Sequence, residues 1–214
     1  MTCCCPHSIS GGRLFSFFAR SYRRRFAKKG FEPSQRQLLA GLSQAGFQDA
    51  SLLEIGSGVG YLHQTLLAQG ARTAVGIDLS ADMLKEAEDW AAERGLAGRT
   101  QYLQGDFIEL LDEVVPAEIT ILDKVVCCYP FADLLLNSAT KKTRRVIALT
   151  YPRQRWFIRG VVELMAVVLR LAGSDFRAYV HDPRDIERWI TKAGFKKTFQ
   201  QQTFIWLSQV YEKP

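Results

Sequence analysis

The sequence lacks the features that define several broad classes of protein. No apolar run reaches the roughly 20 residues that a membrane-spanning helix needs, because Glu163 interrupts the longest one, near residues 160–169. Residues 14–18 are too few for the apolar core of a secretory signal, and arginines surround them. Hydrophobic residues at 47% and charged residues at 23% exclude a disordered or collagen-like chain. The 214 residues therefore predict one globular domain with a single core.

Cysteine is scarce, and its spacing excludes a disulfide framework. The five cysteines lie at positions 3–5 and 127–128, and adjacent cysteines rarely bridge each other. This usage predicts a reducing compartment, and we expect the protein in the cytoplasm. Cys3, Cys5 and His7 have the chemistry to grip a soft metal, but no second ligand pair with zinc spacing follows them. We therefore predict a reduced terminus and no metal.

Acidic residues are absent from the first 30 positions, which carry seven basic residues. Without these seven, the chain has 21 basic against 22 acidic residues, so the net charge of +6 belongs to the N-terminal segment. We predict a basic arm over residues 1–34 that contains a folded helix, because the aromatic residues Tyr22 and Phe26 are typical of a folded segment. An organellar transit peptide of similar composition is the alternative. A cationic arm suits nucleic acid, a membrane or an anionic substrate, but the body lacks the basic stripe of a dedicated nucleic-acid binder.

Strand and helix patterns alternate through the middle of the chain. Apolar runs predict strands at residues 51–55, 73–77, 100–103, within 119–127 and at 145–150. Helical spacing predicts helices at residues 35–45 and 61–68, from Ser80 to Gly95, and at 131–139. Such alternation with continuous apolar strands predicts a parallel sheet with helices on both faces.

The last third of the chain departs from this alternation. Residues 156–171 predict a long helix, and Asp182-Pro183 opens another helix that Gly194 ends. The runs at 195–202 and 203–211 have almost no connection between them, so they must pair antiparallel, because a parallel crossover needs about a dozen residues. We predict a domain over residues 35–214, with 156–181 as a lid insert.

A glycine segment, Glu54-Ile55-Gly56-Ser57-Gly58-Val59-Gly60, lies where the first strand becomes a helix. Glycines there allow a tight turn and the close approach of a ligand. Asp78 ends the second strand 20 residues after Gly58, where a carboxylate can accept both hydroxyls of a ribose. The two features together predict a nucleoside-bearing cofactor.

Two features of the sequence indicate which kind of nucleoside-bearing cofactor the site binds. The dinucleotide pattern would place its third glycine at Tyr61, but this sequence has it at Gly60. Glu54 also places a carboxylate beside the loop, which disfavours a pyrophosphate. A cofactor without phosphate and with positive charge fits better, and S-adenosylmethionine has that profile.

Together with Gly76-Ile77-Asp78-Leu79-Ser80 and Gly105-Asp106-Phe107, the glycine segment resembles the cofactor half of class I S-adenosylmethionine-dependent methyltransferases over about residues 50–150. The resemblance implies an α/β fold: a Rossmann-like, doubly wound, mostly parallel seven-stranded sheet with a C-terminal antiparallel hairpin, plus an N-terminal helix and a lid helix. It assigns the ribose to Asp78 and the adenine to Asp106 and Phe107. The predicted cofactor-binding residues are Glu54, Gly56, Gly58, Gly60, Asp78, Leu79, Asp106, Phe107 and Asp123.

The end of the fourth strand, residues 123–130, should border the transferred methyl group. Its Cys127-Cys128-Tyr129-Pro130 does not match the Asn/Asp-Pro-Pro-aromatic signature of enzymes that methylate base amino groups. We interpret the two cysteines as packing residues rather than nucleophiles. Tyr22, Tyr129 and His181 are the catalytic candidates. We interpret Tyr151 as a further group within reach of the substrate, and His63 as a surface or packing residue.

The helix at 156–171 has two interpretations. The favoured one is a lid helix buried against the sheet edge, with the stripe of Arg159, Glu163 and Arg170 in water. The other is an apolar wall for a hydrophobic substrate, or a surface that makes peripheral membrane contact beside the basic arm.

We predict an enzyme that transfers a methyl group from S-adenosylmethionine to a small, largely apolar acceptor by in-line displacement. One alternative is an RNA or protein methyltransferase that uses the basic arm. Another is a non-catalytic cofactor-binding scaffold, because the sequence has no catalytic signature. The sequence does not define an oligomeric state.

Overall fold

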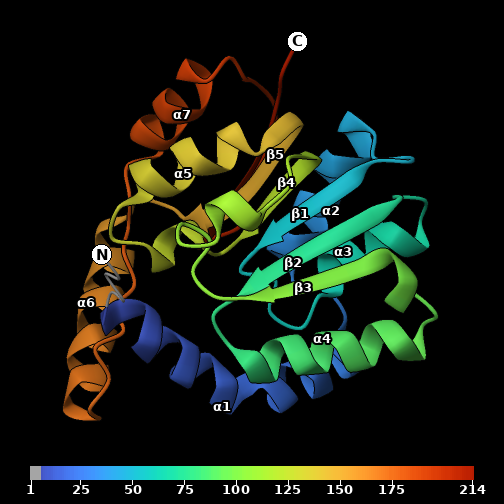
Figure 1. Ribbon diagram of the computed structural model, residues 1–214. Helices are drawn as coiled ribbons and strands as arrows, with labels where there is room; N and C mark the ends of the chain where they lie inside the picture. Colours follow the sequence, from blue (N-terminus) through green and yellow to red (C-terminus); the bar gives the residue numbers. More distant parts are fainter. Residues whose placement is uncertain (1–5) are drawn as a thin grey trace.

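The seven strands form one sheet in the order β3-β2-β1-β4-β5-β7-β6, with helices on both faces (Figure 1). This structure is a computed structural model that describes residues 6–214; before residue 21 it describes beyond the backbone only Gly12, Ser16 and Ala19. The strands are β1 Ser51–Ile55, β2 Thr73–Asp78, β3 Thr100–Gln104, β4 Ala117–Asp123, β5 Thr143–Pro152, β6 Lys196–Gln202 and β7 Trp206–Glu212. The predicted Rossmann-like sheet is confirmed.

Strands β1 to β5 are parallel, and their apolar character explains why both faces are covered. Leu53 of β1 lies in register with Val75 of β2 on one side and with Thr120 of β4 on the other. Residues 52–55 of β1 are all 2% exposed or less. A strand with no polar face must have helices on both sides of it.

The antiparallel hairpin completes the sheet. β7 pairs antiparallel with β5 on one side and with β6 on the other, so it lies inside the sheet. Thr203 closes the turn between β6 and β7, because its hydroxyl accepts hydrogen bonds from the backbone N–H groups of Ile205 (3.3 Å) and Trp206 (2.9 Å). The predicted hairpin is therefore confirmed.

Helices α4 and α7 begin at residues whose side chains cap them. Ser80 accepts a hydrogen bond from the N–H of Met83 (3.1 Å), and Asp182 accepts one from the N–H of Arg184 (2.8 Å). The helices are α1 Pro6–Lys29, α2 Pro33–Ala45, α3 Tyr61–Ala68, α4 Ala81–Glu93, α5 Ala132–Lys141, α6 Trp156–Leu171 and α7 Pro183–Lys192. Short 3₁₀ helices lie at Ala97–Arg99, Leu111–Glu113 and Val126–Cys128.

The sheet runs through the middle of the domain's core and divides it into two buried clusters, one on each face. Leu38 of α2, Leu66 of α3 and Ala91 of α4 belong to one buried cluster with the sheet. Leu135 of α5 and Ile186 of α7 belong to the cluster on the other face. The sheet is thus doubly wound, and ligands of such sheets bind outside the carboxyl ends of the parallel strands.

The basic arm forms α1, as predicted, and packs beside α4. Arg23 makes ion pairs with Glu86 (3.1 Å) and Glu93 (2.6 Å). The ring of Phe26 stacks on Tyr61, with 3.8 Å between the centroids. The second half of α1 is therefore held against the domain by charge and by aromatic contact.

The interpretation of α6 as a helix buried against the sheet edge is wrong. Among its residues only Ile158 is buried, while Trp156 is 87% and Leu171 is 85% exposed. The physical reason lies in the neighbouring elements, because β7 and β6 occupy the sheet edge beyond β5 and α2 packs on this part of the sheet. No helix of residues 6–214 is both long and apolar enough to cross a membrane.

Candidate active site

A cavity of about 780 Å³ lies at the carboxyl ends of the parallel strands. It is bordered by the glycine segment after β1 and by the residues that follow β2, β3 and β4. Of the predicted cofactor-binding residues, the cavity brings together Glu54, Gly56, Gly58, Asp78, Leu79, Asp106, Phe107 and Asp123. Gly60 does not line it. Among the catalytic candidates, Tyr22 and Tyr129 line the cavity, and His181 does not.

The glycine segment turns through backbone conformations that other residues rarely adopt. Gly56 has a φ of 66°, and a Cβ there would collide with a methyl group of Val125. Gly58 has a φ of 52°, and a Cβ there would meet no atom within 4 Å. The first glycine therefore allows close packing of the chain, whereas the second leaves open space at the cavity wall.

Asp78 joins the glycine segment to the start of α4. Its carboxylate accepts hydrogen bonds from the N–H of Gly58 (2.8 Å) and from the N–H of Ser80 (2.9 Å). Burial raises the pKa of Asp78, and the hydrogen bonds from the backbone oppose that rise. The carboxylate is fixed in orientation and keeps lone pairs for a ligand.

Glu54 lies beneath the glycine segment and is paired with His63, which is buried, so the interpretation of His63 as a surface residue is wrong and packing is the alternative that holds. Its Oε2 lies 2.5 Å from Nδ1 of His63, and His63 Nε2 lies 3.0 Å from the Tyr102 hydroxyl. Both Glu54 and His63 are at most 2% exposed. Burial raises the pKa of Glu54, and the hydrogen bond from His63 opposes it. Gly60 leaves room for this pair, because a Cβ at position 60 would lie 2.8 Å from the His63 ring.

The loop after β3 contributes Asp106 and Phe107 to the cavity. Asp106 accepts hydrogen bonds from the N–H of Ile108 (2.9 Å) and from the hydroxyl of Tyr129. Phe107 is 1% exposed and is packed in the core as well as against the cavity. The structure thus places a carboxylate beside an aromatic ring, the pair that the resemblance assigns to an adenine.

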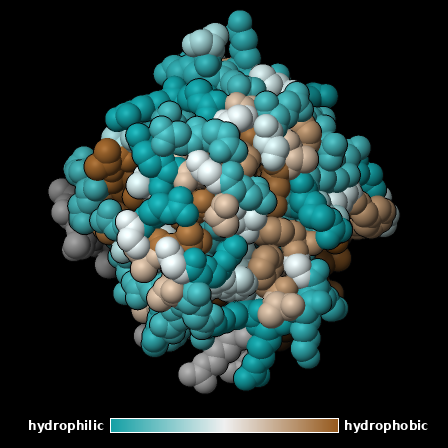
Figure 2. Space-filling view, turned by 90° about the vertical axis from the view of Figure 1, so that its right-hand side faces the viewer, coloured by the Kyte–Doolittle hydropathy of each residue, from teal (hydrophilic) through white to brown (hydrophobic). Residues whose placement is uncertain are grey.

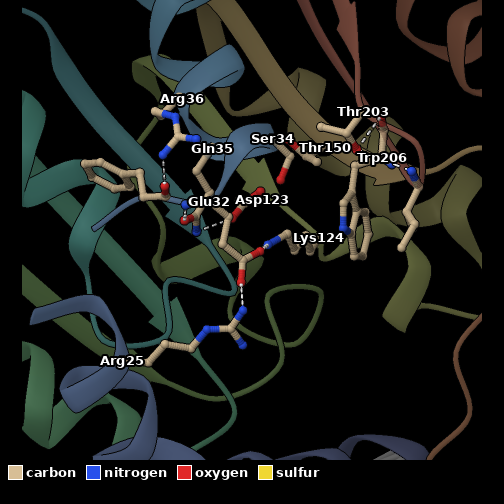
Figure 3. A network of polar contacts seen from close by, with 12 residues as sticks. Arg25, Glu32, Ser34, Gln35, Arg36, Asp123, Lys124, Thr150, Thr203 and Trp206 are labelled. Carbon is tan, nitrogen blue, oxygen red and sulfur yellow. Dashed lines mark hydrogen bonds and ion pairs between the residues drawn. The ribbon is translucent and has the colours of Figure 1, made fainter. Parts of the chain in front are cut away.

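Asp123, at the end of β4, is held by α2 (Figure 3). Its Oδ2 accepts a hydrogen bond from the side chain of Gln35 (2.9 Å), and Thr150 also contacts the carboxylate. Burial raises the pKa of Asp123, and the nearby Lys124 ammonium opposes that rise. Gln35 is 88 positions away along the chain, and no motif in the sequence links it to Asp123.

Lys124 follows in a left-handed conformation with a φ of 61°, which is rare for a residue with a side chain. Its Nζ lies 2.5 Å from Glu32 and 5.2 Å from the centre of the Trp206 ring, and Arg25 pairs with the same carboxylate at 2.9 Å (Figure 3). This network joins the end of α1, the start of α2 and β7 at the cavity wall, and no motif in the sequence signalled it.

The remaining polar side chains considered in the sequence are buried or engaged in hydrogen bonds, which limits their contact with a substrate. Tyr151, interpreted as reachable, is 1% exposed and donates a hydrogen bond to Gln209 (2.7 Å), so that interpretation is wrong. His181 binds the backbone carbonyl of Tyr129 (2.9 Å), and burial lowers its pKa. Cys127 and Cys128 both donate to the carbonyl of Lys124. The hydrogen bond between the two thiols and their burial raise the pKa of Cys128, which disfavours a thiolate nucleophile.

No group of His, Cys, Asp or Glu side chains in the described part of the chain could hold a metal ion. The grouping considered in the sequence, Cys3, Cys5 and the His7 side chain, lies outside the described residues and side chains.

The polar end of the cavity fits a nucleoside with a charged tail. Asp78 offers oriented oxygens, and the wall at Gly58 has room for a ligand to lie against the backbone. The Ser57 hydroxyl also lines this end, and among the described residues it has no hydrogen-bond partner. A buried hydroxyl of this kind is usually satisfied by a ligand or water.

The sheet order, the hairpin and the cavity at the strand ends define the class I S-adenosylmethionine-dependent methyltransferase fold. Residues 52–148 match the family model described as a methyltransferase domain. Residues 52–148 therefore form a methyltransferase domain, and this match together with the fold supports an S-adenosylmethionine-dependent enzyme with S-adenosylmethionine as its cofactor.

Solved structures of several methyltransferases have a similar fold. Magnesium protoporphyrin IX methyltransferase from Synechocystis PCC 6803, with bound S-adenosylhomocysteine, is 18% identical, with a TM-score of 0.70 over 94% of this chain and 99% of that one. A putative sarcosine dimethylglycine methyltransferase from Galdieria sulphuraria is 13% identical, with a TM-score of 0.67 over 84% and 85% of the two chains. An O-methyltransferase family 2 protein from Planctomyces limnophilus, in complex with apigenin, is 18% identical, with a TM-score of 0.61 over 87% and 63%. No curated protein matches the sequence.

Proposed function

We propose that this enzyme methylates a small, largely apolar molecule. The observation that carries the proposal is the two-part lining of one cavity. Polar groups of the glycine segment and Asp78 line one part, and apolar side chains line another. These apolar residues are Phe131, Leu134, Met165 and Phe176. A single space of this kind can hold the cofactor and an apolar acceptor side by side.

For the cofactor, we assign the ribose hydroxyls to Asp78 and the adenine to Asp106 and Phe107. The residues proposed to hold the methionine portion are Glu54, Gly56, Gly58 and Asp123, with Leu79 packed beside the nucleoside. When bound, S-adenosylmethionine supplies a methyl group that its sulfonium charge already activates. The protein's own task is then to orient an acceptor and to exclude water from it.

The side chains near the acceptor are suited to orientation rather than to strong base catalysis. Burial raises the pKa of Tyr22, so this phenol keeps its proton at neutral pH. The Tyr129 hydroxyl donates a hydrogen bond to Asp106. His181 lies outside the cavity lining, and its ring nitrogen is engaged by the carbonyl of Tyr129. These contacts support alignment of the acceptor for in-line displacement.

The relatives and the ion pairs of α1 both favour a small acceptor. The porphyrin methyltransferase and the apigenin complex are proteins of similar fold that act on or bind small ring compounds. Arg23 and Arg25 of the basic arm are engaged by glutamates of this chain, which leaves fewer cations for an RNA phosphate backbone.

Calorimetric titration with S-adenosylhomocysteine tests the cofactor assignment. Asp78→Ala should weaken binding by about 1.5–3 kcal/mol, because it removes a charge-assisted contact to the ribose. Asp82→Ala is the matched control, since Asp82 lies on the next helix, is exposed and does not line the cavity. Equal affinity of Asp78→Ala and the wild type would overturn the assignment.

Substitution of the apolar lining tests the acceptor. A screen of small aromatic and aliphatic compounds with labelled S-adenosylmethionine identifies methylated products, and Leu134→Asp should then raise the KM of each accepted compound with less effect on kcat. Methylation of RNA or protein, with no small molecule accepted, would contradict the proposal.

A further inference from the structure

Helix α6 exposes an apolar stripe along its length. Val161, Leu164, Val168 and Leu171 follow the 3–4–3 spacing that places side chains on one helix face. Their exposed fractions are 60%, 66%, 56% and 85%. We call these four residues the α6 outer stripe.

The polar residues of α6 do not explain this exposure. The side facing the domain carries Ile158, which is buried, and Val162, Ala166 and Leu169, which are half-buried. Charge is confined to Arg159, Glu163 and Arg170, which leave most of the circumference apolar. A surface helix normally turns a polar face to water, so a helix that is apolar on two sides is expected to have a second apolar environment.

Exposed aromatic and aliphatic residues continue the stripe at the start of α6. Trp156 is 87% exposed, and Phe204 and Ile205, in the turn between β6 and β7, are 66% and 44% exposed. Phe157 stacks on Phe204 with 5.2 Å between the ring centroids, which links the helix to the turn. Two segments far apart in sequence thus contribute to one apolar corner.

Arginines border this corner. A hollow of about 280 Å³ is lined by Arg153, Arg155 and Arg184, and by Asp182, which is engaged as the cap of α7. The Arg155 guanidinium lies 5.2 Å from the Phe204 ring centroid. Cationic heads beside exposed aromatic rings are the arrangement that suits the boundary between lipid headgroups and acyl chains.

The other side of the molecule has a different character. Figure 2 shows the side turned away from α6, where hydrophilic residues cover most of the surface and apolar residues lie in smaller groups. The asymmetry gives the molecule one side suited to an apolar phase.

We propose that the α6 outer stripe, with Trp156, Phe204 and Ile205, docks on an anionic lipid bilayer, and that the arginine hollow receives a lipid phosphate. Charge complementarity selects this occupant, because the apolar stripe alone would also suit a second copy of the chain, whereas three arginines beside it match an anionic surface. The docking does not depend on the proposed acceptor. It has a consequence for access, because Met165 of α6 and Phe176 after it line the cavity. An apolar molecule dissolved in the bilayer then has a short route to that end of the cavity.

Vesicle co-sedimentation of the full chain tests the docking. Vesicles of phosphatidylcholine mixed with phosphatidylglycerol should bind the wild type at least about tenfold more tightly than vesicles of phosphatidylcholine alone, and added salt should weaken the binding. Leu164→Asp/Val168→Asp should lower the affinity for the mixed vesicles by at least about tenfold. Arg155→Gln/Arg184→Gln should lower it by about fivefold or more and should flatten the salt dependence.

Val115→Asp is the matched control. Val115 is 70% exposed, but it precedes the amino end of β4, at the end of the sheet opposite the cavity. Affinity for S-adenosylhomocysteine, measured for every variant, should be unchanged and reports correct folding. Equal vesicle binding by the wild type and the Leu164→Asp/Val168→Asp variant would overturn the proposal, as would no binding of the wild type to the mixed vesicles. A wild-type dimer in light scattering that Leu164→Asp/Val168→Asp converts to a monomer would assign the stripe to a second copy and overturn it as well.

Discussion

The Glu54 carboxylate lies 2.5 Å from Nδ1 of His63, beneath the glycine segment and closed to solvent. Glu54 belongs to β1 and His63 to the first turn of α3, so the contact ties together the two elements that flank the segment. The N–H of His63 also donates to the same carboxylate oxygen at 3.3 Å. The pair therefore fixes the angle at which the chain leaves the strand and enters the helix.

Replacement of His63 should destabilise the protein strongly. His63→Ala leaves the Glu54 carboxylate buried without its partner, which typically costs about 3–5 kcal/mol. Urea unfolding measures this loss. Lys85→Ala is the control, because it removes the exposed Lys85–Asp89 ion pair and should cost less than about 1 kcal/mol. Losses of the same size in both variants would show that the buried pair has no structural role.

A side chain at Gly58 should affect the cofactor more than the fold. Gly58→Ala and Gly95→Ala place a Cβ at φ values of 52° and 67°, with no atom within 4 Å in either case. Each should therefore cost about 1–2 kcal/mol of folding stability through backbone strain. Only Gly58 lines the cavity, so only Gly58→Ala should weaken S-adenosylhomocysteine binding in calorimetry. Equal binding by both variants would mean that no ligand lies against Gly58.

The buried carboxyl of Asp123 should make stability fall as pH rises. Its pKa is raised in the fold, so the folded state holds a proton that the unfolded chain releases near the usual value of about 4. Stability is then greatest below that value and is lost as pH rises through the folded pKa. Asp123→Asn removes this dependence and should be more stable than the wild type at pH 7, with a smaller difference at pH 4. Urea unfolding of the ligand-free protein at both pH values measures it; a difference that is constant with pH would contradict the burial effect.

No single candidate base should be indispensable for methyl transfer. Tyr22→Phe, Tyr129→Phe and His181→Ala should each lower kcat only partially, because alignment of the acceptor supplies much of the rate. Initial rates with an accepted compound measure this, and a chelator should leave them unchanged. A loss greater than about 10⁴-fold in one variant would identify a dedicated catalytic group.

The sheet was predictable because its strands are short apolar runs whose pattern does not depend on distant residues. The fourth strand was the least well bounded: residues 119–127 were expected to contain it, and it is Ala117–Asp123. The chain leaves the strand at Lys124, whose left-handed backbone has no signature in the residue type. The cofactor end of the site was predictable too, because glycines and an acid at fixed spacing have direct physical meaning.

The rest of the site depends on contacts that sequence spacing does not encode. Lys124 meets Glu32 across 92 positions, and Trp206 approaches from the last strand. His63 had no visible partner until β1 and α3 were placed together. For α6, the pattern revealed the apolar faces but not which of them the domain covers. The expected cytoplasmic location stays a prediction.

Because β7 lies between β5 and β6, the sheet closes only when the last strand has been synthesised. β5 and β6 leave the ribosome before β7 does. Until β7 follows, β5 has one unpaired edge, and this strand contains apolar residues such as Ile147 and Leu149. An apolar edge of this kind is a template for pairing with other chains. A nascent chain that stops before β7 should therefore aggregate or recruit chaperones. Translation through residue 212 should remove this tendency, because β7 then pairs with the open edge of β5.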